Sequence, residues 1–241
     1  MPQPFRSWRV LPHSQLTVVD DNLLTVVGDL PMPIGDFPRR MTVARLRDGR
    51  LVIFSAISLE EREMVALEKF GPPTFLVVPS DLHRMDAKIW KERYPRALVL
   101  APEGAYDKVN EVVPVDATGF DFRDQSVQFL TVPGTEGHEA ALVVTSAGGT
   151  TLVLNDLIWN IDDRPGFGGW LMKISGMTGK QPHFPPALVA RRSIRDKPAL
   201  RQQLETWAAI YALKRIIVSH GAIIDHDPES VLRELAKQLE D

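Results

Sequence analysis

The sequence predicts an α/β protein in which two β-layers carry helices on their outer faces. Two observations support this fold class. Short apolar runs rich in β-branched residues alternate with segments of helical periodicity, and the alternation occurs in both halves of the chain. With 241 residues, of which 44 % are hydrophobic, the chain can bury a core without a disulfide or a structural metal. We therefore expect one layered domain over residues 1–241.

The composition excludes several functional classes. The sequence contains no cysteine, which rules out disulfide frameworks, thiolate zinc sites, iron–sulfur clusters and cysteine nucleophiles. Its 28 basic and 31 acidic residues give a net charge of −3, so no nucleic-acid or membrane partner is expected. No segment approaches about 18 consecutive apolar residues, and the N-terminus lacks the apolar run of a signal peptide. We expect a soluble cytoplasmic protein.

The first half is rich in strands. Five apolar runs predict them, at residues 23–28, 41–46, 50–57, 75–80 and 97–102. The pair Asp48-Gly49 between the second and third runs indicates a hairpin turn. A helix is predicted after the third run, because Ser58 and Glu61 have the spacing of a capping box and Gly71 before two prolines ends the pattern. A second helix is predicted after the fourth run.

The second half repeats these elements around one long irregular stretch. Three runs predict strands, at residues 126–132, 141–147 and 150–156. Residues 160–198 are rich in proline and glycine and show little periodicity beyond one short helix near Leu171, which is typical of functional loops. The helix that follows is expected to bury a face that includes Tyr211. Residues 215–221 predict a strand, and Asp227-Pro228 begins a last helix.

Side chains suited to metal binding stand at or just after the ends of four predicted strands. They are His83, His138, Asp156 and His220. A metal site needs imidazole and carboxylate groups that converge from rigid elements, and strand ends provide that rigidity. Because thiolates are absent, the set suits Zn²⁺, Mn²⁺ or Fe. Each residue taken alone is also a common hydrogen-bonding turn residue, so a purely structural role stays open.

The order of these motifs resembles the metallo-β-lactamase superfamily, whose fold is a four-layer αβ/βα sandwich. The resemblance covers about residues 20–240, and three stretches carry it. The family's turn with a histidine is similar to TVPGTEGHEAALVV, its strand end with a bridging aspartate to TLVLNDLIW, and its last histidine turn to IIVSHGAII. The resemblance implies the same sandwich here.

The family's first motif, a Thr-His-x-His-x-Asp-His run after a strand, is incomplete in this chain. Its place is taken by VVPSDLHRMDAKIW, in which His83 alone matches a family histidine. Asp81 and Asp86 stand where two other histidines belong, and Met85 replaces the aspartate. Ser55 stands where the family has an aspartate at the end of an earlier strand. The chain therefore resembles a diverged branch of the superfamily that lacks the full motif.

The resemblance implies a hydrolase with one or two ions of Zn, Mn or Fe. The implied metal ligands are His83, His138, Asp156 and His220. Asp81 and Asp86 are the candidate catalytic carboxylates at the altered positions. Such ions would lower the pKa of water to about 7, so that it attacks a small ester, thioester, lactone or phosphodiester. The loss of the carboxylate at Met85 leaves an alternative open, a metal-free member that acts as a binding or scaffold domain.

Candidate substrate contacts come from the long irregular stretch and the residue just before it. They are Trp159, Trp170 and His183. The two aromatic rings could line a pocket for a small-molecule substrate or fill the core beneath the stretch. Basic residues between positions 191 and 201 indicate either an anion-binding rim, and hence an anionic substrate, or only a solvated face.

Overall fold

The ten strands of the described residues form two sheets. The computed structural model describes residues 3–32 and 35–240, with only the backbone of Arg192. The first sheet contains, in spatial order, β1 (Thr17–Asp20), β2 (Leu23–Leu30), β3 (Phe37–Arg45), β4 (Leu51–Phe54), β5 (Pro73–Val77) and β6 (Leu98–Leu100). The second contains β10 (Leu213–Val218), β9 (Gly149–Leu154), β8 (Ala140–Ser146) and β7 (Val127–Thr131). All nine predicted strands are present, and β1 is an addition to them.

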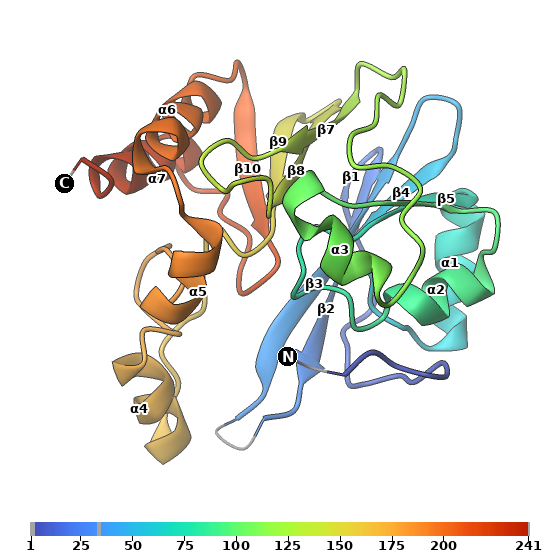
Figure 1. Cartoon of the computed structure of the whole chain (residues 1–241), viewed down its shortest axis with the longest axis horizontal. Coiled ribbons are helices and arrows are strands. Elements are labelled where there is room, and N and C mark those ends of the chain that lie inside the picture. Colours follow the sequence, from blue (N-terminus) through green and yellow to red (C-terminus); the bar gives the residue numbers. More distant parts are fainter. Residues whose placement is uncertain (1–2, 33–34, 241) are drawn as a thin grey trace.

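Helices lie on both outer sides of this pair of sheets (Figure 1). The helices of the first half are α1 (Glu61–Phe70), α2 (Ala87–Arg93) and α3 (Tyr106–Asn110), the last preceded by a 3₁₀ turn, η1 (Glu103–Ala105). Those of the second half are α4 (Gly166–Ile174), α5 (Ala187–Ser193), α6 (Lys197–Ala208) and α7 (Pro228–Lys237). No helix in the described part of the chain is long and apolar enough to cross a membrane.

The layers arise because successive strand residues face opposite sides of a sheet. In β4, Leu51 and Ile53 pack in the cluster that includes the apolar faces of α1 and α2, whereas Val52 and Phe54 pack between the two sheets. In β8, Leu142 packs between the sheets. A third cluster joins the second sheet to α6 and α7. These clusters confirm the predicted arrangement of helix, sheet, sheet and helix layers.

Three local predictions are wrong. Ser58 forms no capping box, because α1 begins at Glu61 without a side-chain cap and the Ser58 hydroxyl donates to Asp86. Tyr211 lies beyond the end of α6 and is 93 % exposed. The long stretch 160–198 contains two helices, α4 at the expected place and the unpredicted α5.

Strand direction brings several loops to one edge of the molecule. In the first sheet, β4 and β5 are parallel and Phe54 pairs with Val77 at their carboxyl ends. In the second, β9 and β10 are parallel and Leu154 pairs with Val218. The residues that follow these pairs therefore leave their sheets at matching levels, which is the usual position of a binding site in parallel sheets.

Candidate metal centre

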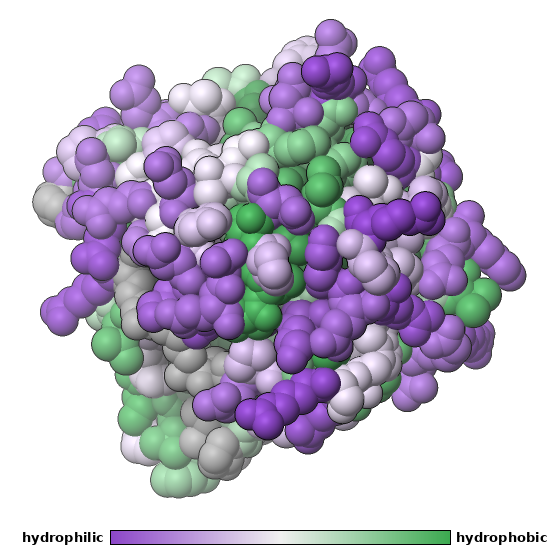
Figure 2. Space-filling model, turned by 45° about the vertical axis from the view of Figure 1, so that its right-hand side comes forward, coloured by the Kyte–Doolittle hydropathy of each residue, from purple (hydrophilic) through white to green (hydrophobic). Residues whose placement is uncertain are grey.

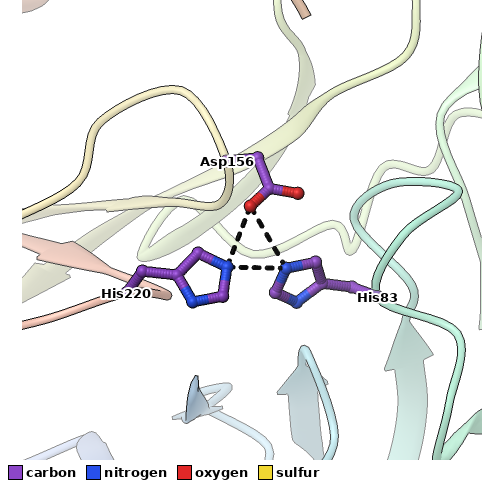
Figure 3. Close-up of side chains that lie close together, drawn as sticks. All are labelled: His83, Asp156 and His220. Atoms are coloured by element: carbon purple, nitrogen blue, oxygen red, sulfur yellow. Dashed lines mark hydrogen bonds and ion pairs between the residues drawn. The ribbon is translucent and has the colours of Figure 1, made fainter. Parts of the chain in front are cut away.

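Two imidazoles and one carboxylate meet between the two sheets (Figure 3). The Nε2 atoms of His83 and His220 lie 3.1 Å apart. Oδ1 of Asp156 lies 2.9 Å from Nε2 of His220 and 3.4 Å from Nε2 of His83. Among the described residues, this is the one group of three or more His, Asp or Glu residues whose ligand atoms lie within 4.8 Å of one another. The structure thus brings together three of the four predicted metal ligands.

The strand register explains this meeting. Asp156 and His220 each stand two residues after a paired strand end, so they leave β9 and β10 at the same level. Gly221 follows His220 with a φ of +107°, and a Cβ at that position would lie 1.9 Å from the Asn160 carbonyl oxygen. Only glycine permits this close approach, which lets Asn160 N–H donate to the His220 carbonyl at 3.0 Å. His83 enters from the loop after β5 of the other sheet.

The second ring nitrogen of each histidine is fixed from outside the cluster. Nδ1 of His220 lies 2.7 Å from the Pro38 carbonyl oxygen, which only accepts, so this nitrogen donates. In the neutral ring, Nε2 of His220 then presents a lone pair to Asp156. Nδ1 of His83 lies 2.8 Å from the hydroxyl of Ser55. Outer partners of this kind hold metal-binding histidines in orientation.

The cluster requires a positive charge between its acceptor atoms. An unprotonated Nε2 beside a carboxylate oxygen at 2.9 Å is repulsive unless a proton or a metal ion lies between them. Ligands at about 2.0–2.2 Å from an ion stand about 3.0–3.5 Å from one another in octahedral or tetrahedral geometry. The observed separations of 2.9, 3.1 and 3.4 Å match this spacing. Two imidazoles with one carboxylate are a donor set for Zn²⁺ or Fe²⁺, so the residues fit a single ion.

Burial and charge set the electrostatics of the carboxylates. Burial alone would raise the pKa of Asp156, but the neighbouring imidazoles of His83 and His220 hold it well below its usual value. Glu139 is also buried, and burial together with the charge of Asp156 raises its pKa well above the usual range. Oε2 of Glu139 accepts from the backbone N–H of Asp156 at 3.3 Å and from Asn155 Nδ2 at 3.1 Å. Asp156 is therefore the ionised member of this pair.

The remaining predicted metal and catalytic residues lie outside the cluster. His138 is half-buried in the turn before β8, and its backbone N–H donates to Thr135. Asp81 is half-buried in the His83 loop, where its charge contributes to the raised pKa of Glu139. Asp86 is buried and accepts from Arg39 and, at 2.9 Å, from the backbone and hydroxyl of Ser58. Both oxygens of Asp86 are thus engaged in a structural network.

The predicted substrate contacts occupy three different environments. Trp159 is buried and packs 5.1 Å from the ring of His220 and 5.2 Å from that of Phe37. Trp170 is 53 % exposed on α4 and stacks on Phe167. His183 pairs through its backbone with Trp159, and its Nδ1 lies 2.9 Å from the Gln181 carbonyl oxygen. Trp159 alone among these three lines the cavity described next.

A cavity of about 510 Å³ opens beside the cluster, a volume usual for small-molecule sites. His83, Asp156 and His220 form part of its wall. The β2–β3 hairpin and the loops after β4 and β5 supply other parts of the wall. The stretch 160–198 contributes Met177 and Val189. The cluster is therefore accessible from a chamber large enough for a substrate.

Arg40, which the sequence reasoning missed, fixes the turn that carries His220. Its Nε donates to the Val218 carbonyl at 3.1 Å and its Nη2 to the Gly221 carbonyl at 2.6 Å, one on each side of His220. Burial lowers the pKa of Arg40 to about 10, which still leaves the guanidinium charged at neutral pH. The sequence gives no signal for this role, because Arg40 stands beside a second arginine, Arg39, and just before the predicted strand 41–46.

Solved structures with the same architecture include metallo-β-lactamases. The mono-zinc form of FIM-1 from Pseudomonas aeruginosa is 14 % identical, with a TM-score of 0.62 over 95 % of this chain and 96 % of that one. DIM-1 is 14 % identical, with a TM-score of 0.61 over 95 % and 99 % of the two chains. The enzyme from Hirschia baltica is 13 % identical, with a TM-score of 0.61 over 93 % and 98 %. No family model and no curated protein matches the sequence.

Proposed function

We propose that this chain, which has the metallo-β-lactamase fold, is a metal-dependent hydrolase whose ion is held by His83, Asp156 and His220. One observation carries the proposal: three acceptor atoms from two different sheets face one another at ligand spacing beside a cavity. The similar structure in a mono-zinc form supports the choice of Zn²⁺ as the first ion to test. The proposed substrates are small esters, thioesters, lactones and phosphodiesters.

Different residues would bind the ion, orient its ligands and close the cavity in such a reaction. A divalent ion bound by the three donors would supply Lewis acidity and lower the pKa of a water molecule. Ser55 and the Pro38 carbonyl hold the two imidazoles in orientation. Trp159 closes the cavity wall beside His220, which keeps bulk water from that side of the cluster. For a carboxylic ester, the oxygen of water adds to the carbonyl carbon, and the bond to the leaving oxygen breaks.

The number of ions is a separate part of the proposal. The three clustered donors suffice for one ion with an open position, as in catalytic zinc sites. His138 remains the predicted additional ligand, and Asp81 remains the carboxylate nearest in sequence to His83. Asp86 would have to leave Arg39 before it could contribute.

Metal content and thermal stability test the proposal together. Protein prepared without chelator should hold one ion per chain by elemental analysis. At a free concentration of 100 times the dissociation constant, bound metal adds about 3 kcal/mol, which should raise Tm by about 6–10 °C. EDTA should reverse this shift, and His220→Ala should abolish it. The matched control is His226→Ala, which changes an exposed histidine six residues away.

The alternative of a metal-free binding or scaffold domain gives the opposite results. Zn²⁺, Mn²⁺ and Fe²⁺ would then leave Tm unchanged, and elemental analysis would find no stoichiometric metal.

The variant His138→Ala distinguishes a site that holds one ion from a site that holds two. If His138 is a ligand, its loss should reduce the metal stoichiometry or affinity, and if it is not, only a modest change in stability should follow.

A further inference from the structure

The wall of the cavity is predominantly apolar. Its apolar members come from several surrounding segments and include Met32, Phe37, Ile57, Trp159, Met177 and Val189. Hydrophobic residues also gather at the centre of the face shown in Figure 2, within a largely hydrophilic surface. An apolar wall stabilises an apolar ligand by removing its surface from water, at about 25 cal/mol for each Å².

The charged groups of the wall are already compensated. Among the described residues that line the cavity, Arg39 is the one lysine or arginine, and it pairs with Asp86 in the same wall. Nε and Nη2 of Arg39 make no hydrogen bond, but both atoms are buried and not exposed to the cavity, so only the ion pair with Asp86 balances the Arg39 charge. The other titratable members are His83, Asp156 and His220 of the cluster. Outside the proposed ion site, the described wall thus has no free cation to balance a carboxylate or a phosphate, and burying an unpaired anion is costly.

The basic residues that suggested an anionic substrate lie elsewhere. Arg191 and Arg195 are exposed, and Arg195 lies 3.7 Å from Glu136. Neither lines the cavity. In this region Val189, an apolar residue, forms the wall.

We propose that the cavity takes an uncharged carboxylic ester, thioester or lactone whose apolar part fills the space lined by these side chains. Of the substrate classes named above, phosphodiesters should react most slowly, because the wall outside the ion site carries no charge to balance an anion. The reaction rests on the proposed function, whereas the binding preference rests on the wall alone. Water adds across the carbonyl carbon, the bond to oxygen or sulfur breaks, and a carboxylic acid and an alcohol or thiol leave. The step needs no oxidant or reductant.

Hydrolysis rates of esters with increasing chain length test the preference for apolar substrates. With zinc-loaded protein, kcat/KM is measured for methyl esters of C2 to C8 acids and for acetates of C2 to C8 alcohols. In at least one series, each added methylene should raise kcat/KM about fourfold until the cavity is full. A flat response in both series, or faster hydrolysis of bis(p-nitrophenyl) phosphate than of any ester, overturns the proposal.

Binding to metal-free protein gives a readout that does not depend on turnover. N-alkyl acetamides from ethyl to octyl are titrated into EDTA-treated protein by calorimetry, since these amides are uncharged and resist hydrolysis. Affinity should rise with chain length, and the binding should show a negative heat-capacity change. Hexanoate, the charged comparison ligand, should bind at least tenfold more weakly than N-hexyl acetamide. Equal or tighter binding of hexanoate overturns the proposal.

A matched pair of variants locates the effect. Met177→Gln places a polar group of similar length in the wall and should reduce affinity for the octyl amide several-fold. Leu188→Gln makes a comparable change at a position that is 82 % exposed and does not line the cavity, so it should leave affinity unchanged. Equal effects of the two variants, or none from Met177→Gln, count against the cavity as the binding site.

The two proposals fail in different ways. If metal binds and short esters are hydrolysed without any dependence on chain length, the proposed function stands and the substrate preference is wrong. If no metal binds, the proposed function is wrong, and the amide titration still decides what the cavity accepts.

Discussion

The orientation of the His83 ring depends on one small side chain, the hydroxyl of Ser55. This residue follows β4 with a φ of 56°, in the left-handed region that disfavours residues with a Cβ. The backbone conformation places the Ser55 hydroxyl 2.8 Å from Nδ1 of His83. Ser55 is therefore both a residue in a strained backbone conformation and the residue that orients His83.

Removing the Ser55 hydroxyl should weaken metal binding. Ser55→Ala is expected to raise the dissociation constant for Zn²⁺ about 10–100-fold, the usual effect of losing an outer partner. Ser55→Gly should lose the same affinity but give a higher Tm than Ser55→Ala, since glycine adopts positive φ without strain. Competition with a chelating dye measures the affinity. An unchanged dissociation constant in both variants would show that His83 needs no support from this position.

Arg40 should prove sensitive to a substitution that keeps its charge. Lysine cannot span the Val218 and Gly221 carbonyls, so Arg40→Lys should lower Tm by several degrees and weaken zinc binding about tenfold. Arg233→Lys is the control, because Arg233 is a half-exposed residue of α7 that also donates to a backbone carbonyl. Thermal melts with and without zinc make the comparison. Similar small effects from both variants would contradict a positioning role for Arg40.

At this scale the sequence identified the centre of the cluster but not its surroundings. His83, Asp156 and His220 were predictable because each follows an apolar strand. The neighbours His138 and Glu139 could not be distinguished in the same way. The geometry of the turn at 133–138 decides which of them contacts Asp156, and the structure places Glu139 there. The contacts of Ser55 and Arg40 depend on backbone conformation and on pairing between distant segments.

Among the elements, the stretch 160–198 joins the cavity to an exposed helix. Met177 and Val189 face the cavity, and Met172 packs with Phe37 and Trp159 in a small cluster of its own. The outer side of α4 exposes other large apolar side chains, including Trp170. The two tryptophans of this region therefore have different neighbours and should respond differently to substitution.

A pair of tryptophan variants tests this difference. Trp159→Leu should lower Tm by several degrees and weaken binding of the octyl amide, because it removes buried contacts and part of the cavity wall. Trp170→Leu should change Tm by about 1 °C or less, as is usual for an exposed side chain. Differential scanning fluorimetry and calorimetry give the two readouts. A loss of amide affinity in Trp170→Leu would place the ligand against α4 instead.

The existence of most elements followed from local pattern, whereas their ends did not. Continuous apolar runs predicted strands because both faces of each sheet are buried. The capping box at Ser58 failed because Asp86, 28 residues away, takes up the serine hydroxyl. Pattern also placed Tyr211 in a helix that ends at Ala208. Contacts between distant residues thus decided the details that short sequence windows could not.

At the scale of the whole molecule, an ion pair joins the two sheets at the end of β9 and β10 that lies away from the cluster. Asp20 of β1 accepts from Arg215 of β10 at 2.9 Å and from the backbone N–H of Gly148 at 3.2 Å. Burial alone would raise the pKa of Asp20, but these hydrogen bonds and that from Asp21 hold it below its usual value. Which strands would pair, and hence which charges would meet here, was beyond the reach of the sequence.

The contact between Asp20 and Arg215 should make the free energy of unfolding depend on pH. Since the pKa of Asp20 is lower in the folded state, its contribution is present above the unfolded pKa of about 3.9 and is lost as pH falls through the folded value. Asp20→Asn should therefore be less stable than the parent at pH 7, and the difference should shrink below pH 4. Urea unfolding at pH 3, 5 and 7 measures it. The exposed Asp225→Asn is the control, and a difference independent of pH would contradict the assignment.

The donors of the cluster are far apart along the polypeptide: His83 and His220 are separated by 137 positions and belong to opposite sheets. A nascent chain that has emerged from the ribosome only as far as β6 contains just one of the three donors, His83. If the proposed ion binds to all three donors, it can do so only after both halves have docked, so metal loading would report completed assembly.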